Sequence, residues 1–154
     1  MAGKIEARLA ELGIALPTPM APVANYVPFV ITGDLLFVSG QVPAIDGKIA
    51  WTGKVGATLG VEEGTKACRQ CFINLIVQVK AATGDLDRVV QVVRLGGFIA
   101  AGPDFSQHAA VMNGASNLAV EVFGERGRHA RTTVGVPSLP LDAAVEVEGL
   151  FRIA

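Results

Sequence analysis

The sequence is poor in charge, in aromatic residues and in long apolar runs. Only 18% of its 154 residues are charged, and it holds one tryptophan, one tyrosine, two histidines and two cysteines. A membrane-spanning helix needs about 20 consecutive apolar residues, yet the run Leu95–Ala101 already ends at Gly102–Asp104. The segment Ile5–Leu12 interleaves charged and apolar residues, unlike the core of a signal peptide. We therefore expect no membrane span and a cytoplasmic protein.

An excess of charge of one sign is also missing. Thirteen basic residues against fourteen acidic ones give a formal net charge of −1. Proteins that bind nucleic acid usually present a basic patch, and the one local cluster here, Glu125–Arg131, is typical of a solvated loop between a helix and a strand. The charge balance argues against nucleic acid as a partner.

Several catalytic and metal-binding signatures are absent. The sequence contains no P-loop, no Gly-x-Gly-x-x-Gly, no Gly-x-Ser-x-Gly and no His-Glu-x-x-His. Cys68 and Cys71 form a Cys-x-x-Cys pair, but a zinc site needs further ligands, and only His108 and His129 remain. We predict that both cysteines are buried in the core, that both histidines are exposed or capping, and that the protein has no metal and no cofactor.

What the chain does have is apolar residues and glycine. Hydrophobic residues make up 51% of the sequence, and there are eighteen glycines. A chain of this length can bury a core without disulfides or metals, so we interpret residues 1–154 as one domain. Because monomers rarely expose large apolar patches, this apolar content favours an oligomer.

We predict that the first 20 residues form an extension of that domain. Ile5, Leu9 and Leu12 have helical spacing, and Gly13 is a C-cap signal. Four prolines between positions 17 and 28 then exclude regular helix. We predict a short helix over Lys4–Leu12, followed by an extended arm that contains Tyr26.

The remaining elements follow from periodicity and turn signals. An Asp46–Gly47 turn is typical of a hairpin, and paired Gly96–Gly97 indicates a bulge or a close backbone approach. The predicted elements are a hairpin of Leu35–Val42 with Lys48–Thr52, a helix over Glu62–Ala82 ended by Gly84, a strand over Val89–Ile99, a helix over Gln107–Phe123 capped by Ser106, and strands over Arg131–Ser138 and Ala144–Ile153.

This order, ββαβ followed by αββ, predicts a fold class. Strands paired in hairpins and connected through two helices imply an α+β sheet with both helices on one face. The opposite face must also be covered, which again favours an oligomer.

Arg131 is the residue that most needs an explanation. It opens a strand of small and apolar residues and shares a face with Thr133 and Gly135. Burying a guanidinium there costs free energy unless the group is paired. Two explanations remain open: an ion pair with Glu146 or Glu148 on the next strand, or a carboxylate anchor in a ligand site, where the planar fork binds two oxygens.

These residues also carry a resemblance to a known family. The runs Ala130–Val136, Leu139–Pro140 and Val145–Glu148 resemble the C-terminal signature of the Rid (YjgF/RidA) family, in its endoribonuclease-like YjgF subgroup. The run Leu36–Pro43 resembles the family's first hairpin strand, and Ala21–Tyr26 its N-terminal arm. The resemblance covers about residues 21–153.

The resemblance implies a chorismate-mutase-like fold, with a ββαββαββ-type sheet and two helices packed on one face. It further implies a homotrimer with three ligand clefts between subunits. Characterised members hydrolyse reactive enamines and imines such as 2-aminoacrylate to a 2-keto acid and ammonia, without a cofactor. Two other functions stay open: a non-catalytic trimer that binds a small carboxylate metabolite and regulates a partner, and RNA cleavage.

Carried over by motif, the resemblance assigns roles to individual residues. Arg131 is expected to hold the substrate carboxylate, and Glu146 to position or deprotonate the attacking water. Tyr26, Ser39, Gly40 and Thr133 are expected to line the cleft. Ser116 and Asn117 occupy the helix region where members of the family have an asparagine. A carboxylate beside Arg131 would stay ionised easily and be a weak base, so Glu146 is expected mainly to orient water.

Overall fold

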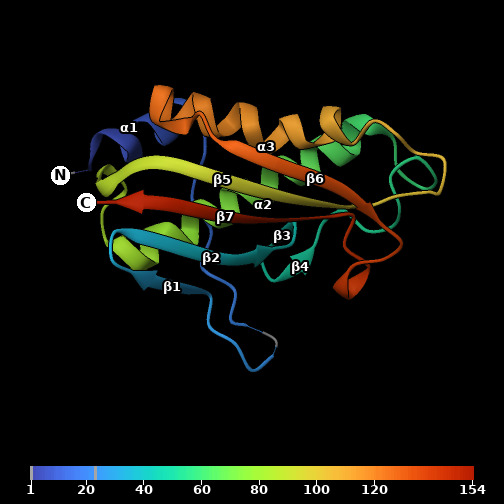
Figure 1. The fold of residues 1–154 in the computed structure, drawn as a ribbon, viewed down its shortest axis with the longest axis horizontal. Coiled ribbons are helices and arrows are strands. Elements are labelled where there is room, and N and C mark those ends of the chain that lie inside the picture. The colour runs from blue at the N-terminus through green and yellow to red at the C-terminus, as the bar shows by residue number, and fades with distance from the viewer. Residues whose placement is uncertain (1, 23) are drawn as a thin grey trace.

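The computed structural model describes residues 2–22 and 24–154. Its main elements are a mixed sheet and three α-helices (Figure 1). The strands are β1 (Phe29–Thr32), β2 (Leu35–Gln41), β3 (Ala44–Ile45), β4 (Lys48–Ile49), β5 (Val89–Ala100), β6 (Ala130–Val136) and β7 (Val145–Ile153). The α-helices are α1 (Lys4–Glu11), α2 (Val61–Thr83) and α3 (His108–Phe123), and the short 3-10 helices are η1 (Leu86–Arg88), η2 (Gly124–Gly127) and η3 (Pro140–Asp142).

Five of the strands form the main sheet, in the spatial order β1-β2-β7-β5-β6. Its pairs are antiparallel except for β5 and β6, which are parallel and connected through α3. The strands β3 and β4 form a separate two-stranded hairpin. The main sheet therefore follows the order ββαβαββ, which corrects the ββαββαββ pattern implied by the family resemblance.

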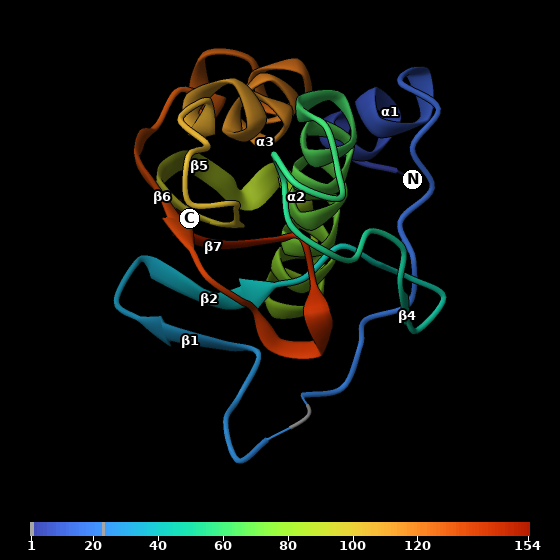
Figure 2. The same ribbon diagram turned by 90° about the vertical axis from the view of Figure 1, so that its right-hand side faces the viewer.

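Both long helices cover the same face of the sheet (Figure 2). Along β7, Val145, Val147 and Phe151 are fully buried, whereas Glu146 and Glu148 lie on the opposite face. Gly97 is needed for the close packing, because a Cβ there would clash with the Met112 side chain of α3. The two faces of the sheet therefore differ in chemistry: the face that the helices cover carries the apolar core, and the opposite face carries the glutamates of β7.

The open face carries exposed apolar side chains. Val30 of β1, Phe37 of β2 and Val134 of β6 are each more than 40% exposed. Their exposure matches the expectation that another subunit covers this face. No helix of the described residues is long and apolar enough to cross a membrane.

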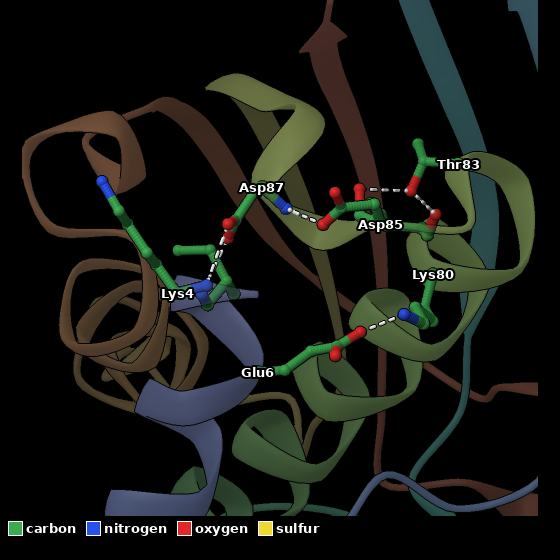
Figure 3. A network of polar contacts seen from close by, with 8 residues as sticks. Lys4, Glu6, Lys80, Thr83, Asp85 and Asp87 are labelled. Carbon is green, nitrogen blue, oxygen red and sulfur yellow. Dashed lines mark hydrogen bonds and ion pairs between the residues drawn. The ribbon is translucent and has the colours of Figure 1, made fainter. Parts of the chain in front are cut away.

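The N-terminal helix is fixed to the domain by a carboxylate from another element. Asp87 of η1 accepts hydrogen bonds from the backbone N–H groups of Lys4 and Ile5, both at 2.8 Å (Figure 3). Glu6 pairs with Lys80 of α2, and Ile5 and Leu9 are buried. Since Gly3 at the N-cap has no capping side chain, Asp87 supplies the cap from a distance.

Replacing Asp87 by alanine should loosen α1. Loss of an N-cap costs about 1 kcal/mol, so we expect a lower free energy of unfolding at pH 7 in urea titrations. The backbone bonds from Ile5 and Lys4 lower the pKa of Asp87, so its contribution is present above the unfolded pKa of about 4 and is lost as the pH falls. The difference between Asp87→Ala and wild type should therefore shrink in acid. Asp104→Ala, at an exposed bend, is the control, and an equal loss in both variants would contradict this role.

Most helix and strand positions predicted from the sequence are confirmed. The three helices and the last two strands start and end within about two residues of their predicted limits, and Gly84 ends α2 with a φ of 73°. The N-cap of α3 is Gln107 rather than Ser106. The glycine pair in β5 marks a close approach, while the register irregularities of that strand lie earlier, between Val89 and Arg94.

The predicted first hairpin is wrong in its pairing. The Asp46–Gly47 turn exists, but it connects two-residue strands, and the partners of β2 are β1 and β7. The strand β1 begins directly after Pro28, the last proline of the arm, in a segment for which the sequence predicted no element. Its alternation is too short to be recognised, since only Phe29–Thr32 pairs.

Candidate functional site

A cavity of about 470 Å³ opens where β2 ends and β7 begins. Glu146 and Gly40 line it from the strands, and Asn74, Val77 and Gln78 line it from α2. The remaining lining residues come from the proline-rich arm, the end of β2 with the residue after it, the β3–β4 hairpin and η3: Pro17, Thr18, Pro19, Met20, Ala21, Pro22, Ala24, Tyr26, Pro28, Gln41, Val42, Ala44, Asp46, Gly47, Pro140 and Leu141. Its size lies in the range typical of small-molecule sites.

A β-bulge places the strand residues of this cavity. The register of β2 on β7 shifts between Val38 and Gln41, so that Ser39 and Gly40 lie at the irregularity. A Cβ at position 40 would clash with the Glu146 carboxylate. Bulges re-aim side chains next to sites, and here the glycine leaves room for Glu146.

Glu146 is half-buried and has no ion-pair partner among the described residues. Burial, and then the nearby charge of Glu148, raise the pKa of Glu146. Glu148 itself pairs with Arg94 at 3.7 Å. A carboxylate with a raised pKa is a better proton acceptor near neutral pH than an ordinary one.

Arg131 of β6 is held on the helical side of the sheet. Its Nη1 donates to Asn113 Oδ1 at 2.8 Å and to Ser116 Oγ at 3.0 Å, and its Nη2 donates to Ala109 O at 3.3 Å. These three bonds use three of the five N–H donors of a guanidinium. No described residue accepts from Nε, so Nε and the second Nη2 hydrogen remain available to bind two carboxylate oxygens.

His129 supports Arg131 through Ser116. The Nδ1 of His129 lies 2.6 Å from Gly127 O, and since a carbonyl only accepts, Nδ1 carries the proton. The other nitrogen, Nε2, then accepts from the Ser116 hydroxyl at 2.9 Å. Burial, with a contribution from the Arg131 charge, lowers the pKa of His129 and keeps it neutral. The chain Arg131–Ser116–His129 therefore has one direction of hydrogen bonding, which orients the serine oxygen toward the guanidinium.

Within one chain, Arg131 and Glu146 lie on opposite faces of the sheet. Arg131 contacts α3, whereas Glu146 faces the open side, because β7 alternates. The explanation of Arg131 as an ion-pair partner of Glu146 or Glu148 is therefore wrong within the chain. The expected lowering of the Glu146 pKa by Arg131 is also wrong there, since that pKa is raised.

The other predicted cleft residues divide between the two faces. Tyr26 lines the cavity with Gly40 and Glu146 and is 49% exposed. The Ser39 hydroxyl donates to Val27 O at 2.7 Å and so holds the arm. Thr133 lies on the face of Arg131, and its hydroxyl is buried without a hydrogen-bond partner in the described part of the chain. The side chains of α3 that accept hydrogen bonds from Arg131 are those of Asn113 and Ser116, and not that of Asn117.

Backbone strain lies at the rim of the cavity. Leu141 has a φ of 60° and is 59% exposed, and Asp142 beside it has a φ of 56°. The left-handed region costs an ordinary side chain about 1–2 kcal/mol, and a leucine with so little burial gains little in return. Strain of this kind clusters at binding sites, which makes this rim a candidate part of the site.

The cysteine pair belongs to the core, as predicted. Cys68 and Cys71 are fully buried in α2, and burial raises the pKa of the Cys68 thiol to about 12. In residues 2–22 and 24–154, no three side chains of His, Cys, Asp or Glu are grouped so that they could hold a metal ion.

Three contributors to the site were not found from the sequence. Asn113 lies one helical turn before Ser116, a spacing that would have placed both on one face of α3 beside a following strand. His129 was interpreted as exposed or capping, and no sequence signal connects it to Ser116. Gln78 lies in an apolar stretch of α2. The one sequence signal for it is a polar residue in the middle of a helix that is otherwise apolar there.

The comparisons with known proteins agree with this fold. The family model described as "YjgF/chorismate_mutase-like, putative endoribonuclease" matches residues 6–152. Protein TCP17 of Trypanosoma cruzi is 49% identical over 152 residues, covering 98% of this chain and 95% of that protein. A crystal structure from Shewanella oneidensis is 38% identical with a TM-score of 0.96, covering 98% and 100% of the two chains.

A more distant solved structure shares the fold alone. Escherichia coli TdcF with bound serine is 22% identical with a TM-score of 0.66, covering 91% of this chain and 96% of that one. The family match spans both the β2 strand with its bulge and the β6–β7 segment that carries Arg131 and Glu146. On its fold and its sequence, the chain belongs to the YjgF/chorismate mutase-like family.

Proposed function

We propose that the protein hydrolyses reactive enamine and imine acids, such as 2-aminoacrylate, to a 2-keto acid and ammonia. The observation that carries this proposal is the pair of groups described above: a guanidinium with a free edge and an unpaired carboxylate with a raised pKa in a cavity. The first suits a substrate carboxylate, and the second suits a water molecule. No cofactor is required for this chemistry.

The reaction follows from what those groups can do. Protonation of the enamine carbon gives an imine, whose protonated nitrogen makes the neighbouring carbon electrophilic. Arg131 fixes the carboxylate, and Glu146 takes a proton from water as the oxygen adds to that carbon. Glu146 returns this proton to the nitrogen and then takes the hydroxyl proton as the C–N bond breaks, so that ammonia and the 2-keto acid leave.

The site we propose is shared between two copies of the chain. Arg131 and Glu146 lie on opposite faces of one sheet, so they can act on one small molecule only if they come from different subunits. The exposed Val30, Phe37 and Val134 supply apolar surface for such an assembly. A homotrimer with three clefts, as the family resemblance implies, meets this requirement.

RNA cleavage, which the family description names, receives less support from this chain. Its net charge is −1, whereas proteins that bind a phosphate backbone usually present a basic patch.

The direct test is release of a 2-keto acid from imines made in place by an amino-acid oxidase or a serine dehydratase. Faster release with the purified protein, in proportion to its concentration, is the expected result. Binding of 2-keto acids without acceleration would make the protein a carboxylate-binding regulator instead. Neither binding nor acceleration would exclude the site altogether.

Mixing two inactive variants tests whether the site is shared. Arg131→Ala and Glu146→Gln are co-expressed in equal amounts with different tags, and mixed oligomers are purified. If a site takes Arg131 from one subunit and Glu146 from its neighbour, each mixed trimer regains both groups at one of its three subunit boundaries, so about a third of the sites in the purified mixed trimers are restored. We expect about that share of wild-type activity, whereas a site within one chain predicts none.

A further inference from the structure

The cavity extends beyond the residues that the proposed chemistry uses. Besides Glu146 and Gly40, it is lined by the arm, including Pro17, Pro19 and Met20, and by α2. Figure 2 shows the arm passing from α1 along the side of α2 that faces away from the sheet. An enamine as small as 2-aminoacrylate would fill only a fraction of about 470 Å³. The extra space is large enough for a longer side chain.

Gln78 is a buried polar group facing that space without a partner. Its side chain is 3% exposed and lines the cavity, and none of the hydrogen bonds among the described residues involves its amide. Among the described residues, Thr133 Oγ1 is the one side-chain polar atom that is fully buried without a partner, so the Gln78 amide is reached from the cavity and can bind what occupies it. An amide in this state is suited to bind a ligand.

Asn74, one turn earlier on α2, shows what a purely structural amide does here. Its Nδ2 donates to Val42 O at 2.9 Å and to Ala44 O at 3.0 Å, and its Oδ1 accepts from Gln70. Every polar atom of Asn74 is therefore engaged in holding the β3–β4 hairpin against α2. Gln78 holds nothing comparable.

The arm that lines the cavity is anchored to the domain at both of its ends. At one end the arm follows α1, which Asp87 caps. At the other end, Ser39 binds the arm twice, through its hydroxyl to Val27 O and through its N–H to Pro28 O. A preformed wall reduces the entropy lost on binding.

We propose that this arm-lined part of the cavity receives the substrate side chain, and that Gln78 selects chains with a neutral polar group at their end. This inference rests on the proposed imine hydrolysis, and it names the substrate class as 2-imino acids with side chains several carbons long. Prolines and Val77 contact the apolar stem, and the amide of Gln78 binds the tip. Asp46 and Glu146 line the same cavity and disfavour an acidic tip.

Binding of 2-keto acids tests this class without needing turnover. The probes are pyruvate, 2-oxohexanoate, 2-oxoglutarate and its 5-methyl ester, titrated calorimetrically into the whole protein. We expect the neutral ester to bind about tenfold more tightly than pyruvate and more tightly than 2-oxoglutarate. Equal affinity for all four probes, or no binding of any, would overturn the proposal.

Gln78→Leu isolates the amide. The variant should bind the ester about five- to tenfold more weakly, the change expected for one neutral hydrogen bond, and leave pyruvate unchanged. Its melting temperature should stay close to that of wild type, because the amide faces the cavity and forms no hydrogen bond with the described residues. A structural role would instead lower the melting temperature and weaken all probes alike.

Two further variants complete the experiment. Gln107→Leu makes the same exchange at an exposed position whose side chain forms no cap and should change nothing. Gln78→Met replaces Gln78→Leu should the latter fold poorly. Selective ester binding without imine hydrolysis would refute the proposed function but support the role of the arm-lined part of the cavity. Hydrolysis without selective binding would support the proposed function and refute that role.

Discussion

Arg131→Ala should lower kcat/KM for imine hydrolysis by about 100-fold or more while the protein stays folded. A charged hydrogen bond contributes about 1.5–3 kcal/mol, and the free edge of this guanidinium can form two with a carboxylate. The side chain is only partly buried, and its partners Asn113 and Ser116 can bind water instead. We therefore expect the melting temperature to change by only a few degrees.

Two comparisons separate the role of Arg131 from a general loss of charge. Arg128→Ala removes a neighbouring arginine that pairs only with the exposed Glu125, and it should retain full activity. Arg131→Lys keeps the charge but not the planar fork, so its KM should rise. Steady-state keto-acid release measures all three. Unchanged activity in Arg131→Ala would refute the assignment of this residue.

Glu146→Gln should lower kcat by about 10²- to 10⁴-fold, the usual contribution of a positioned proton acceptor. In wild type, kcat should rise with pH through the raised pKa of Glu146, because the ionised form is the base. The variant should lose this limb of the pH profile. Activity that falls by less than tenfold, with the same profile, would leave Glu146 no role in proton transfer.

The same substitution should stabilise the protein. The pKa of Glu146 is raised in the folded state, so its favourable contribution is complete below the unfolded pKa of about 4.3 and is lost as the pH rises through the folded value. At pH 7, Glu146→Gln removes a half-buried charge without a partner, and its melting temperature should exceed that of wild type. Glu148→Gln, whose carboxylate pairs with Arg94 on the same face, is the matched control and should show no such gain.

The fold was predictable where a residue pattern is long enough to repeat. The helical stripe of α2 and the alternation of β7 each run over several periods and give the correct faces. Phe29–Thr32 spans two periods of a strand directly after a proline, so its pairing with β2 depends on contacts distant in sequence. The Asp46–Gly47 turn was correctly placed, but a turn does not fix how far its strands extend.

The candidate site was predictable only in part, for a similar reason. Arg131 and Glu146 stand out as charges within apolar strands, and each lies on the face that alternation gives it. That these faces are opposite follows only from the common register of β6 and β7 on β5. The unpaired state of Gln78 depends on the path of the arm, which proline spacing describes as extended but does not place.

The arm is joined to the domain at both ends, by the Asp87 cap and by Ser39, and between them it contributes a wall of the cavity and no strand of the sheet. Ile14 and Leu16 pack against the core, so the length of the arm can change without disturbing the core only beyond them. Insertions or deletions between Pro17 and Val27 would raise or lower this wall while Arg131 and Glu146 stay in place. Relatives with arms of different length would then differ in the size of molecule they accept, and this segment is where new specificities could evolve at the least risk to folding.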